Sequence, residues 1–220
     1  IADSPLTVEF RALALDSRST VCRSGSGWLL MDGRRALVGA LGGVSLDDAK
    51  TLHASAQPGC EVLADAEAHE VLRGEWTFVP ARIAALERPW SRPACGERPP
   101  AVRPLLPRDS LDHLPDELRA EIEAQLEHRM VMAGFADDRP VSFASAPWVT
   151  EGFADLSIDT LLEYRRQGIG RTVVAALIEY LLEVGKTPVW GATVDNTASL
   201  AMAANLGITQ SAGELYVYEP

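Results

Sequence analysis

Residues 163–185, EYRRQGIGRTVVAALIEYLLEVG, place two glycines and a cluster of basic residues directly before a long apolar pattern. Apolar side chains within 173–182 recur at helical spacing, and Gly185 is suited to end the helix in a left-handed cap. The first turn of such a helix has amides without partners and a partial positive charge. Because Gly168 and Gly170 have no β-carbon, a ligand can approach these amides closely. The stretch therefore predicts an anion site, best suited to a phosphate or pyrophosphate.

Three arginines, Arg165, Arg166 and Arg171, surround the glycines and add positive charge to this site. Taken alone, the stretch leaves open an ordinary glycine-containing turn with arginines on its surface. The chain as a whole is acidic, with a net charge of −11. Such a charge repels a nucleic-acid backbone and mildly favours cationic small molecules. The sequence therefore predicts no nucleic-acid partner.

The composition is that of a globular protein: 220 residues, 47% of them hydrophobic, allow one large domain or two small ones. No apolar run approaches the ~20 residues that span a bilayer, and no signal peptide is visible from Ile1 onward. Cys22, Cys60 and Cys95 are widely spaced, and the four histidines are scattered. This pattern predicts a cytoplasmic protein with no disulfide framework, no metal and no membrane association.

A proline-rich segment divides the chain. Residues 91–107, SRPACGERPPAVRPLLP, are predicted to be an extended linker, because proline lacks a donor amide and disfavours helix in the residue before it. Residues 1–90 are predicted to be an α/β segment of unknown role. The elements expected there are strands at 35–42 and 60–65 and helices at 45–56 and 66–74.

Residues 108–220 are predicted to form an α/β (α+β) domain, a mixed sheet with helices on it. A helix led by acidic residues is expected first, followed by a hairpin with Asp137 and Asp138 in its turn. The expected elements are a helix at 114–130, a hairpin at 130–146, strands at 153–161, 187–194 and 214–219, and helices after Gly168 and at 196–207.

Two motifs in this domain resemble those of a known family. The pattern Arg165-x-x-Gly168-x-Gly170 follows a predicted strand and resembles the pyrophosphate loop of the GNAT acyltransferase superfamily, whose members bind acetyl-CoA with a [QR]-x-x-G-x-[GA] turn. One strand later, NTASLAMAANLGI resembles the family's N-x-x-[AS] helix. The resemblance covers about residues 100–220, and the first hundred residues carry no motif of this kind.

The resemblance implies a sheet in which two parallel neighbouring strands splay apart, so that the pantetheine arm of the cofactor lies between them. Here those strands are about 154–161 and 188–194. The first alternates, with Leu156 and Ile158 on one face and polar residues on the other. The implied cofactor-binding residues are Asp159, Thr160, Leu161, Arg165, Arg166, Gln167, Gly168, Ile169, Gly170, Arg171, Thr172, Asn196 and Ser199.

Acyl transfer to an amine needs a proton acceptor, and a carboxylate is the usual base in this superfamily. Asp155 is closest to the family's common position, and Glu151 lies in the turn before it; Asp159 is a further candidate. The alternative for each is a solvated or structural carboxylate. Ala203 stands where the family often has a tyrosine that protonates the leaving thiolate. The last predicted strand offers Tyr216 and Tyr218 as substitutes, with packing as the alternative.

The sequence thus predicts an acyl-CoA-dependent N-acyltransferase that moves an acetyl group from acetyl-CoA to a small-molecule or peptide amine. Residues 108–150 are expected to shape the acceptor pocket, and a homodimer is left open. One alternative is a catalytically inactive GNAT-fold module that binds CoA. Another is a nucleotide-binding protein that uses the glycine loop, although the chain lacks a P-loop lysine and Rossmann spacing.

Overall fold

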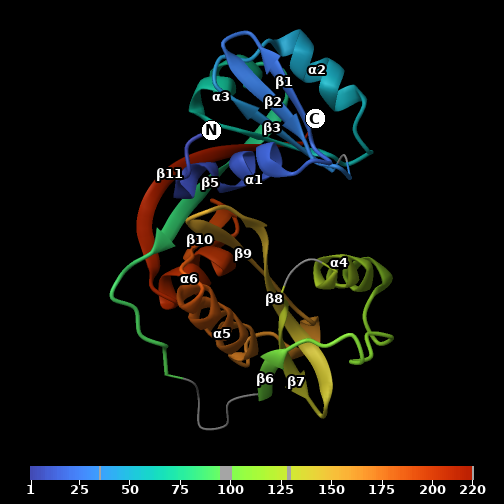
Figure 1. Cartoon of the computed structure of the whole chain (residues 1–220), viewed down its shortest axis with the longest axis vertical. Helices are drawn as coiled ribbons and strands as arrows, with labels where there is room; N and C mark the ends of the chain where they lie inside the picture. Colours follow the sequence, from blue (N-terminus) through green and yellow to red (C-terminus); the bar gives the residue numbers. More distant parts are fainter. Residues whose placement is uncertain (35, 95–100, 128–129, 220) are drawn as a thin grey trace. The chain divides into compact units, whose positions relative to one another are not determined.

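The structure, a computed structural model, describes residues 1–34, 36–94, 101–127 and 130–219 (Figure 1). The chain divides into two compact units. The first comprises Ile1–Ala85, Gly191–Ala201 and Gln210–Pro220, and the second comprises Leu86–Trp190 and Met202–Thr209. This division differs from the predicted boundaries at 90 and 107, because the last strand of the chain pairs with a strand near residue 62.

The first unit is a mixed sheet with three helices. Its strands lie in the order β1-β2-β3-β4-β11-β5. The pairs β1–β2, β2–β3 and β4–β11 are antiparallel, and the pair β3–β4 is parallel. The elements are α1 (Val8–Leu15), preceded by the short helix η1 (Pro5–Thr7), β1 (Thr20–Ser24), β2 (Gly27–Met31), β3 (Leu37–Leu41), α2 (Leu46–Ala54), β4 (Glu61–Ala64), α3 (Ala66–Leu72), β5 (Thr77–Leu86) and β11 (Ile208–Glu219).

The two helices predicted in this unit, α2 and α3, each follow a residue whose side chain caps the first turn. The Ser45 hydroxyl accepts a hydrogen bond from the Asp48 amide at the start of α2. The Asp65 carboxylate accepts one from the Ala68 amide at the start of α3. Such caps satisfy amides that have no partner within the helix. The core below these helices is built from apolar residues of β2, β3, β4 and β11, with Tyr218 fully buried in it.

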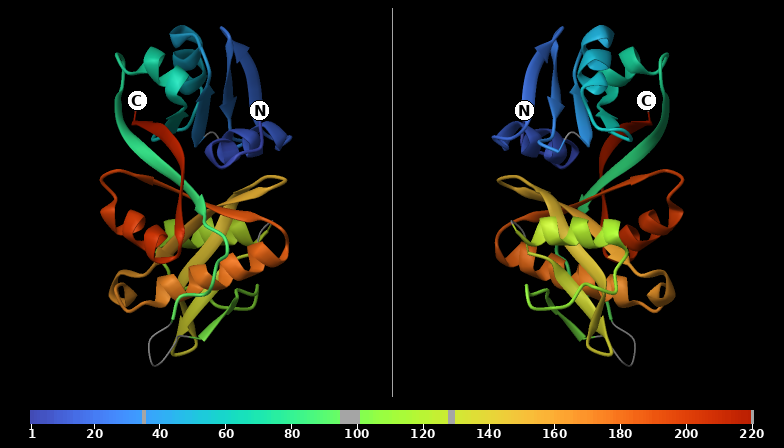
Figure 2. Two further views of the ribbon diagram at one scale, coloured as in Figure 1. Left: turned by 90° about the vertical axis from the view of Figure 1, so that its left-hand side faces the viewer. Right: turned by 90° about the vertical axis from the view of Figure 1, so that its right-hand side faces the viewer.

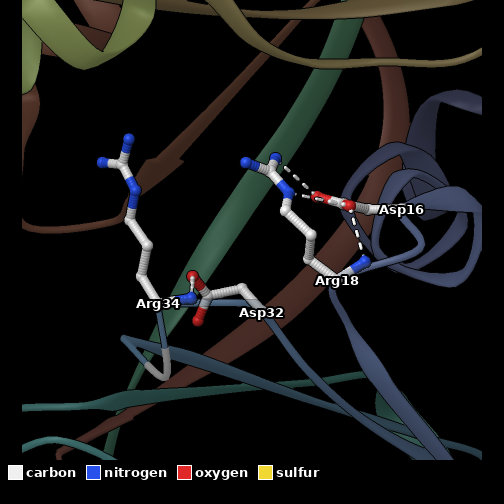
Figure 3. A network of polar contacts seen from close by, with 4 residues as sticks. All are labelled: Asp16, Arg18, Asp32 and Arg34. Carbon is white, nitrogen blue, oxygen red and sulfur yellow. Dashed lines mark hydrogen bonds and ion pairs between the residues drawn. The ribbon is translucent and has the colours of Figure 1, made fainter.

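Two carboxylates hold the loops that follow α1 and β2 (Figure 3). Asp16, at the end of α1, accepts hydrogen bonds of 3.1 and 2.9 Å from the Arg18 guanidinium and one of 2.9 Å from the Arg18 amide. Asp32 accepts bonds from the amides of Arg34, Ala36 and Leu37. These bonds fix the chain where α1 ends and where β3 begins.

The second unit contains the strands β10-β9-β8-β7-β6 in that order. All of these pairs are antiparallel except β9 with β10, which is parallel. The elements are β6 (Ala101–Pro104), α4 (Asp116–Leu126), β7 (Met132–Ala136), β8 (Arg139–Val149), β9 (Phe153–Thr160), the short helix η2 (Leu162–Tyr164), α5 (Ile169–Glu183), β10 (Thr187–Thr193) and α6 (Thr197–Asn205). The division between the units falls within four elements: β5, β10, α6 and β11.

Part of the predicted linker is a strand. Residues 101–104 form β6 and pair antiparallel with β7, which corrects the expectation of a wholly extended connector. Proline is tolerated there because β6 stands at the edge of the sheet, where one side of the strand needs no partner. Cys95 and the middle of the predicted linker lie outside the described residues, as does His128.

The predicted hairpin has the expected turn. Asp137 and Asp138 join β7 to β8 with φ of 47° and 61°. Two successive residues with positive φ are the signature of a type I′ turn, which matches the twist of the strands that it joins.

Helices cover both faces of this sheet (Figure 2). On one face α5 packs so closely that a Cβ at Gly134 would lie 2.7 Å from Val173 and 2.8 Å from Ile169. On the other face Ile122 of α4 joins a cluster with Phe143 and Leu111. Among the helices of the described residues, none is both long enough and apolar enough to cross a membrane.

Candidate functional site

The parallel strands β9 and β10 part midway along β9. Paired residues run from Phe153 with Thr187 to Asp155 with Val189, whereas β9 continues to Thr160. On its other side β9 remains paired with β8, with a bulge between Ser145 and Trp148. Bulges bend a strand and are common beside active sites. The result is a strand whose second half has a partner on one side only, as the family resemblance implied for residues 154–161.

The loop after β9 presents backbone amides at the start of α5. Gly168 precedes the helix with φ of 79°, in the left-handed region where a side chain is disfavoured, and Arg166 has φ of 60°. A Cβ at Gly168 would meet nothing within 4 Å, so the space beside it is open. The first helical bond recorded at this end runs from the Thr172 amide to the Gly168 carbonyl, at 3.1 Å. By helix geometry, the amides from Ile169 to Arg171 have no partner inside α5.

Side chains of the predicted site hold this loop in place. Arg165 Nε donates to the Thr160 carbonyl at 2.9 Å, and Gln167 Nε2 donates to the Glu163 carbonyl at 2.9 Å. Arg171 Nη2 donates to the Ala94 carbonyl at 3.1 Å. Two of the three arginines near the glycines therefore bond to the backbone of this unit.

Thr172 is placed differently from the prediction. Its amide and its hydroxyl both donate to the Gly168 carbonyl, at 3.1 and 3.0 Å. The buried side chain thus satisfies the helix itself. The run of amides that a ligand can use therefore ends at Arg171.

The end of β9 lies against the first turn of α5. A Cβ at Gly170 would lie 3.0 Å from Thr160 Oγ1 and 3.7 Å from Ile158, so glycine permits this approach. The buried Ser142 hydroxyl shares a 2.7 Å hydrogen bond with the Thr160 hydroxyl and donates to the Asp159 carbonyl at 3.2 Å. Burial raises the pKa of the Asp159 carboxyl, and the positive charge of Arg165 opposes this rise.

Leu161 follows with its backbone already in use. Its amide donates to the Val141 carbonyl at 3.0 Å, and its carbonyl accepts from the Tyr164 amide at 2.9 Å. All three residues predicted to bond to the pantetheine arm therefore have a backbone carbonyl that already accepts a hydrogen bond, Asp159 from Ser142, Thr160 from Arg165 and Leu161 from Tyr164.

The two predicted carboxylates occupy different parts of β9. Asp155 is partly buried and stands at the last pair before β9 and β10 separate. Glu151 is exposed in the turn before the strand. The ammonium of Lys186 donates to the carbonyls of Thr150 and Glu151, at 2.7 and 2.9 Å, and so fixes this turn.

Asn196 lies directly before α6 and Ser199 in its first turn, and both belong to the first unit. Asn196 Oδ1 accepts a hydrogen bond of 3.1 Å from the Ser199 amide. This is the geometry of a helix N-cap, which asparagine favours. Asn196 therefore has a structural role in α6, and its Nδ2 group is the part that remains for a ligand.

The tyrosines considered as substitutes for Ala203 pack around His69 in the first unit. The Tyr216 and His69 rings stack with centroids 3.6 Å apart. The Tyr218 hydroxyl lies 2.6 Å from His69 Nδ1. Burial raises the pKa of Tyr218 to about 12, which opposes a role in proton transfer near neutral pH.

One residue with unusual chemistry was not predicted from the sequence. Glu9 is partly buried in α1, and a Cβ at Gly191 of β10 would lie 4.0 Å from Glu9 Oε1 and 3.0 Å from Ile83 of β5. Burial raises the pKa of Glu9 to about 7, although a backbone hydrogen bond lowers it. The sequence signal that was available is a single acidic residue in the otherwise apolar helix VEFRALAL, which also contains Arg11.

Comparisons with known proteins agree with this geometry. A family model described as GNAT acetyltransferase matches residues 132–215. Solved structures match nearly the whole chain. A GCN5-related N-acetyltransferase from Kribbella flavida has 15% identity and a TM-score of 0.66 over 98% of this chain and 94% of that one. A GCN5-related N-acetyltransferase-like protein from Streptococcus suis has 18% identity and a TM-score of 0.64, over 91% and 87%.

An acetyltransferase of the GNAT family from Colwellia psychrerythraea has 12% identity and a TM-score of 0.60, over 100% of this chain and 91% of that one. A search of curated proteins found no match. These findings confirm the resemblance: residues 132–215 match the GNAT acetyltransferase family, and the chain has the mixed α/β fold of GNAT-superfamily structures.

Proposed function

We propose that this protein transfers an acetyl group from acetyl-CoA to an amine. The observation that carries the proposal is the loop from Arg165 to Arg171. This loop follows β9 and leads into α5, and it carries the open amides at the start of the helix. The pairing of β9 with β10 ends earlier, at Asp155. An acyl-CoA needs two features of this kind. Open amides bind its phosphates, and the gap between two separated strands accepts its pantetheine arm. The family match at 132–215 supports the same reading.

The residues of the second unit are suited to this cosubstrate. The amides from Gln167 to Arg171 would hold the pyrophosphate, because the helix start offers both donors and partial positive charge. The open space at Gly168 gives a phosphate room to approach. Asp159 and Thr160 on β9 would offer backbone groups to the pantetheine arm.

Acetyl-CoA supplies an acyl group activated as a thioester. In the proposed reaction the neutral amine nitrogen bonds to the acyl carbon, the carbon–sulfur bond breaks, and CoA leaves as the thiolate. The amine loses a proton, which a carboxylate accepts. Asp155 is the better placed of the two sequence candidates, since it stands where the strands part, whereas Glu151 is exposed in the preceding turn.

A second candidate function is a module that binds acyl-CoA without turning it over. The observation that favours it is Ala203, a buried alanine where the family often has a tyrosine. Turnover separates the two functions. A protein that binds acetyl-CoA and releases no thiol with a broad panel of amines is the binding module.

The site is tested by a charge at Gly168. Aspartate and asparagine both tolerate a left-handed backbone, and the space beside Gly168 is open, so Gly168→Asp and Gly168→Asn should both fold. Only the aspartate places a negative charge where the pyrophosphate is proposed to bind. We expect Gly168→Asp to weaken acetyl-CoA binding at least about tenfold more than Gly168→Asn, as measured by calorimetry.

Gly170 is a poorer position for this test, because its Cβ direction is filled by Thr160 and Ile158, so that a larger side chain would disturb packing. If Gly168→Asp binds acetyl-CoA as tightly as Gly168→Asn and the parent protein, the phosphates lie elsewhere and the proposed site is wrong.

A further inference from the structure

A pocket of about 380 Å³ lies beside the end of α6 in the second unit. Its lining residues come from two segments, 87–93 and 204–207, and both segments belong to the second unit. This volume is within the range of small-molecule sites. Part of the segment that was predicted to be a linker, from Ser91 to Pro93, therefore helps to form a concave surface.

Trp90 provides an aromatic wall of this pocket, and its position is fixed. Its Nε1 donates to the Leu206 carbonyl at 2.7 Å. Gly207 has φ of 79°, and a Cβ there would lie 3.3 Å from Trp90 Cδ1, so glycine permits the indole to lie close to the end of α6. Trp90 is only half-buried, so part of its ring is open to a planar ligand.

The described residues that line the pocket include two charged ones, Glu87 and Arg88. Glu87 is held in place, because its Oε2 accepts from the Thr209 hydroxyl at 2.7 Å and its amide donates to the Gly207 carbonyl at 3.0 Å. Arg88 is exposed, and no described residue forms an ion pair with it. A guanidinium binds phosphate through two parallel N–H groups. The pocket thus combines an aromatic face with a cationic group.

A chain of contacts connects Trp90 to the glycine loop. A Cβ at Gly170 would lie 3.7 Å from Met202 Cε, so α6 touches the first turn of α5 at this point. The Met202 carbonyl accepts from the Leu206 amide at 3.1 Å, and the Leu206 carbonyl accepts from Trp90. Trp90 therefore lies one helical turn along α6 from the residue that touches Gly170.

The segment that carries Trp90 is also tied to α5 directly. The Arg92 guanidinium donates to the Glu179 carboxylate at 2.7 Å, and the Arg171 guanidinium donates to the Ala94 carbonyl at 3.1 Å. Glu179 lies in the second half of α5 and Arg171 in its first turn. From the pocket, this segment therefore runs along α5 toward the amides that are proposed to bind the pyrophosphate.

From this arrangement we infer that the pocket binds the 3′-phosphoadenosine end of the CoA cosubstrate, with the adenine against Trp90 and the 3′-phosphate at Arg88. The inference rests on the proposed acetyl-CoA site and assigns its nucleotide end to residues that precede the segment with the family match. In CoA the adenosine is joined directly to the pyrophosphate, so its pocket must adjoin the pyrophosphate site. Bases stack on aromatic side chains without specific hydrogen bonds. The protein should therefore prefer CoA thioesters to thioesters on a pantetheine that lacks the nucleotide.

The first measurement compares CoA with 3′-dephospho-CoA, which lacks only the phosphate assigned to Arg88. The parent protein should bind CoA about tenfold more tightly in calorimetry, because a charge-assisted hydrogen bond is lost with the phosphate. Arg88→Gln should bind the two compounds alike, and it should fold, since Arg88 is exposed. Arg139→Gln, an exposed arginine of the second unit at the start of β8, is the matched control and should keep the preference.

The second measurement tests the adenine with adenosine 3′,5′-bisphosphate, which is the nucleotide end without the pantetheine arm. This compound should compete with acetyl-CoA in the parent protein. Trp90→Phe and Trp90→Leu both lose the hydrogen bond to Leu206, but only the phenylalanine keeps an aromatic face. Trp90→Leu should therefore bind the bisphosphate about tenfold more weakly than Trp90→Phe. Thermal unfolding followed by circular dichroism shows whether both variants are folded.

Three results would overturn the inference. The parent protein binds CoA and 3′-dephospho-CoA equally, Arg88→Gln keeps the preference for CoA, or folded Trp90→Leu binds the bisphosphate as tightly as Trp90→Phe. Failure of the proposed cosubstrate site gives a different result. In that case Gly168→Asp binds acetyl-CoA as tightly as Gly168→Asn, or the parent protein binds no acetyl-CoA and both proposals fall.

Discussion

At the scale of single residues, the carboxyl of Glu9 makes the stability of the protein depend on pH. Its pKa in the folded protein is about 7, against an ordinary value of 4.5. A raised pKa means that the folded protein prefers the neutral form. The stability that the protonated side chain provides is fully present below 4.5 and is lost as the pH rises through 7.

We therefore expect Glu9→Gln to be more stable than the parent protein above pH 7 and about equal to it below 4.5. The rise of the Glu9 pKa from 4.5 to about 7 corresponds to a difference in the free energy of unfolding on the order of 3 kcal/mol above pH 7. Urea denaturation at several pH values measures this difference. A variant that is less stable than the parent at alkaline pH would mean that the ionised Glu9 has a stabilising partner, and the burial argument would be wrong.

Some properties of single residues follow from the sequence, and others depend on contacts that the sequence does not reveal. Gly168 was predicted because a residue without a β-carbon at the start of a helix lets a ligand approach the amides, and the structure leaves the space beside it open. The raised pKa of Glu9 was not, because it depends on burial, and β10, whose Gly191 Cβ position lies 4.0 Å from Glu9 Oε1, is far away in the sequence. The bond from Arg165 Nε to the Thr160 carbonyl was missed for a similar reason, since a pattern of charge does not reveal which acceptor a long side chain reaches.

At the scale of elements, Asn196 has two candidate roles: it caps α6, or it binds a ligand. Asn196 Oδ1 accepts a hydrogen bond from the Ser199 amide, so Asn196→Ala should lower the free energy of unfolding by ~1 kcal/mol. Asn196→Asp keeps the accepting oxygen and should retain that stability, but it replaces the donor Nδ2. If Nδ2 also binds the pantetheine arm, both variants should lose acetyl-CoA affinity in calorimetry. If Asn196→Asp keeps full affinity, the residue is a cap only.

Elements with a periodic pattern or clear capping residues were predicted, and those without them were missed. The helix after Gly168 and the hairpin with Asp137 and Asp138 in its turn are confirmed. β5 was missed because Pro80 lies inside it, and β11 was predicted short because Gly213 interrupts its apolar pattern. In these strands pairing with neighbours outweighs the local preference of proline and glycine.

At the scale of the whole molecule, the chain order does not follow the division into units. The first unit takes residues from three separate parts of the chain, and its strand β11 comes from the C-terminal end. Tyr216, Val217 and Tyr218 of β11 pair with Ala64, Leu63 and Val62 of β4. A sequence pattern shows that a closing strand exists, but its partner is set by contacts between residues about 150 positions apart. That is why the boundaries near 90 and 107 differ from the observed units.

This connectivity predicts the behaviour of fragments. A fragment of residues 101–220 contains the loop at Gly168, so the sequence alone suggested that it would bind acetyl-CoA. In the structure it would carry β11 without β4, and Tyr218, which is fully buried, would lose the core formed by residues of β2, β3 and β4. We expect the fragment to be insoluble or to lack a cooperative unfolding transition, because an apolar strand without its partner promotes aggregation.

Coexpression with a fragment of residues 1–94 is the matched experiment, since it returns β4 to β11 without restoring the covalent link. The pair should copurify, show a cooperative thermal transition by circular dichroism and bind acetyl-CoA in calorimetry. The mutation Tyr218→Ala in the longer fragment should weaken this assembly, because it removes a large buried side chain from the shared core and the hydrogen bond to His69. If residues 101–220 alone prove folded and bind acetyl-CoA as tightly as the full chain, β11 is not an obligatory part of the first unit, and the earlier boundary near 107 is the better description.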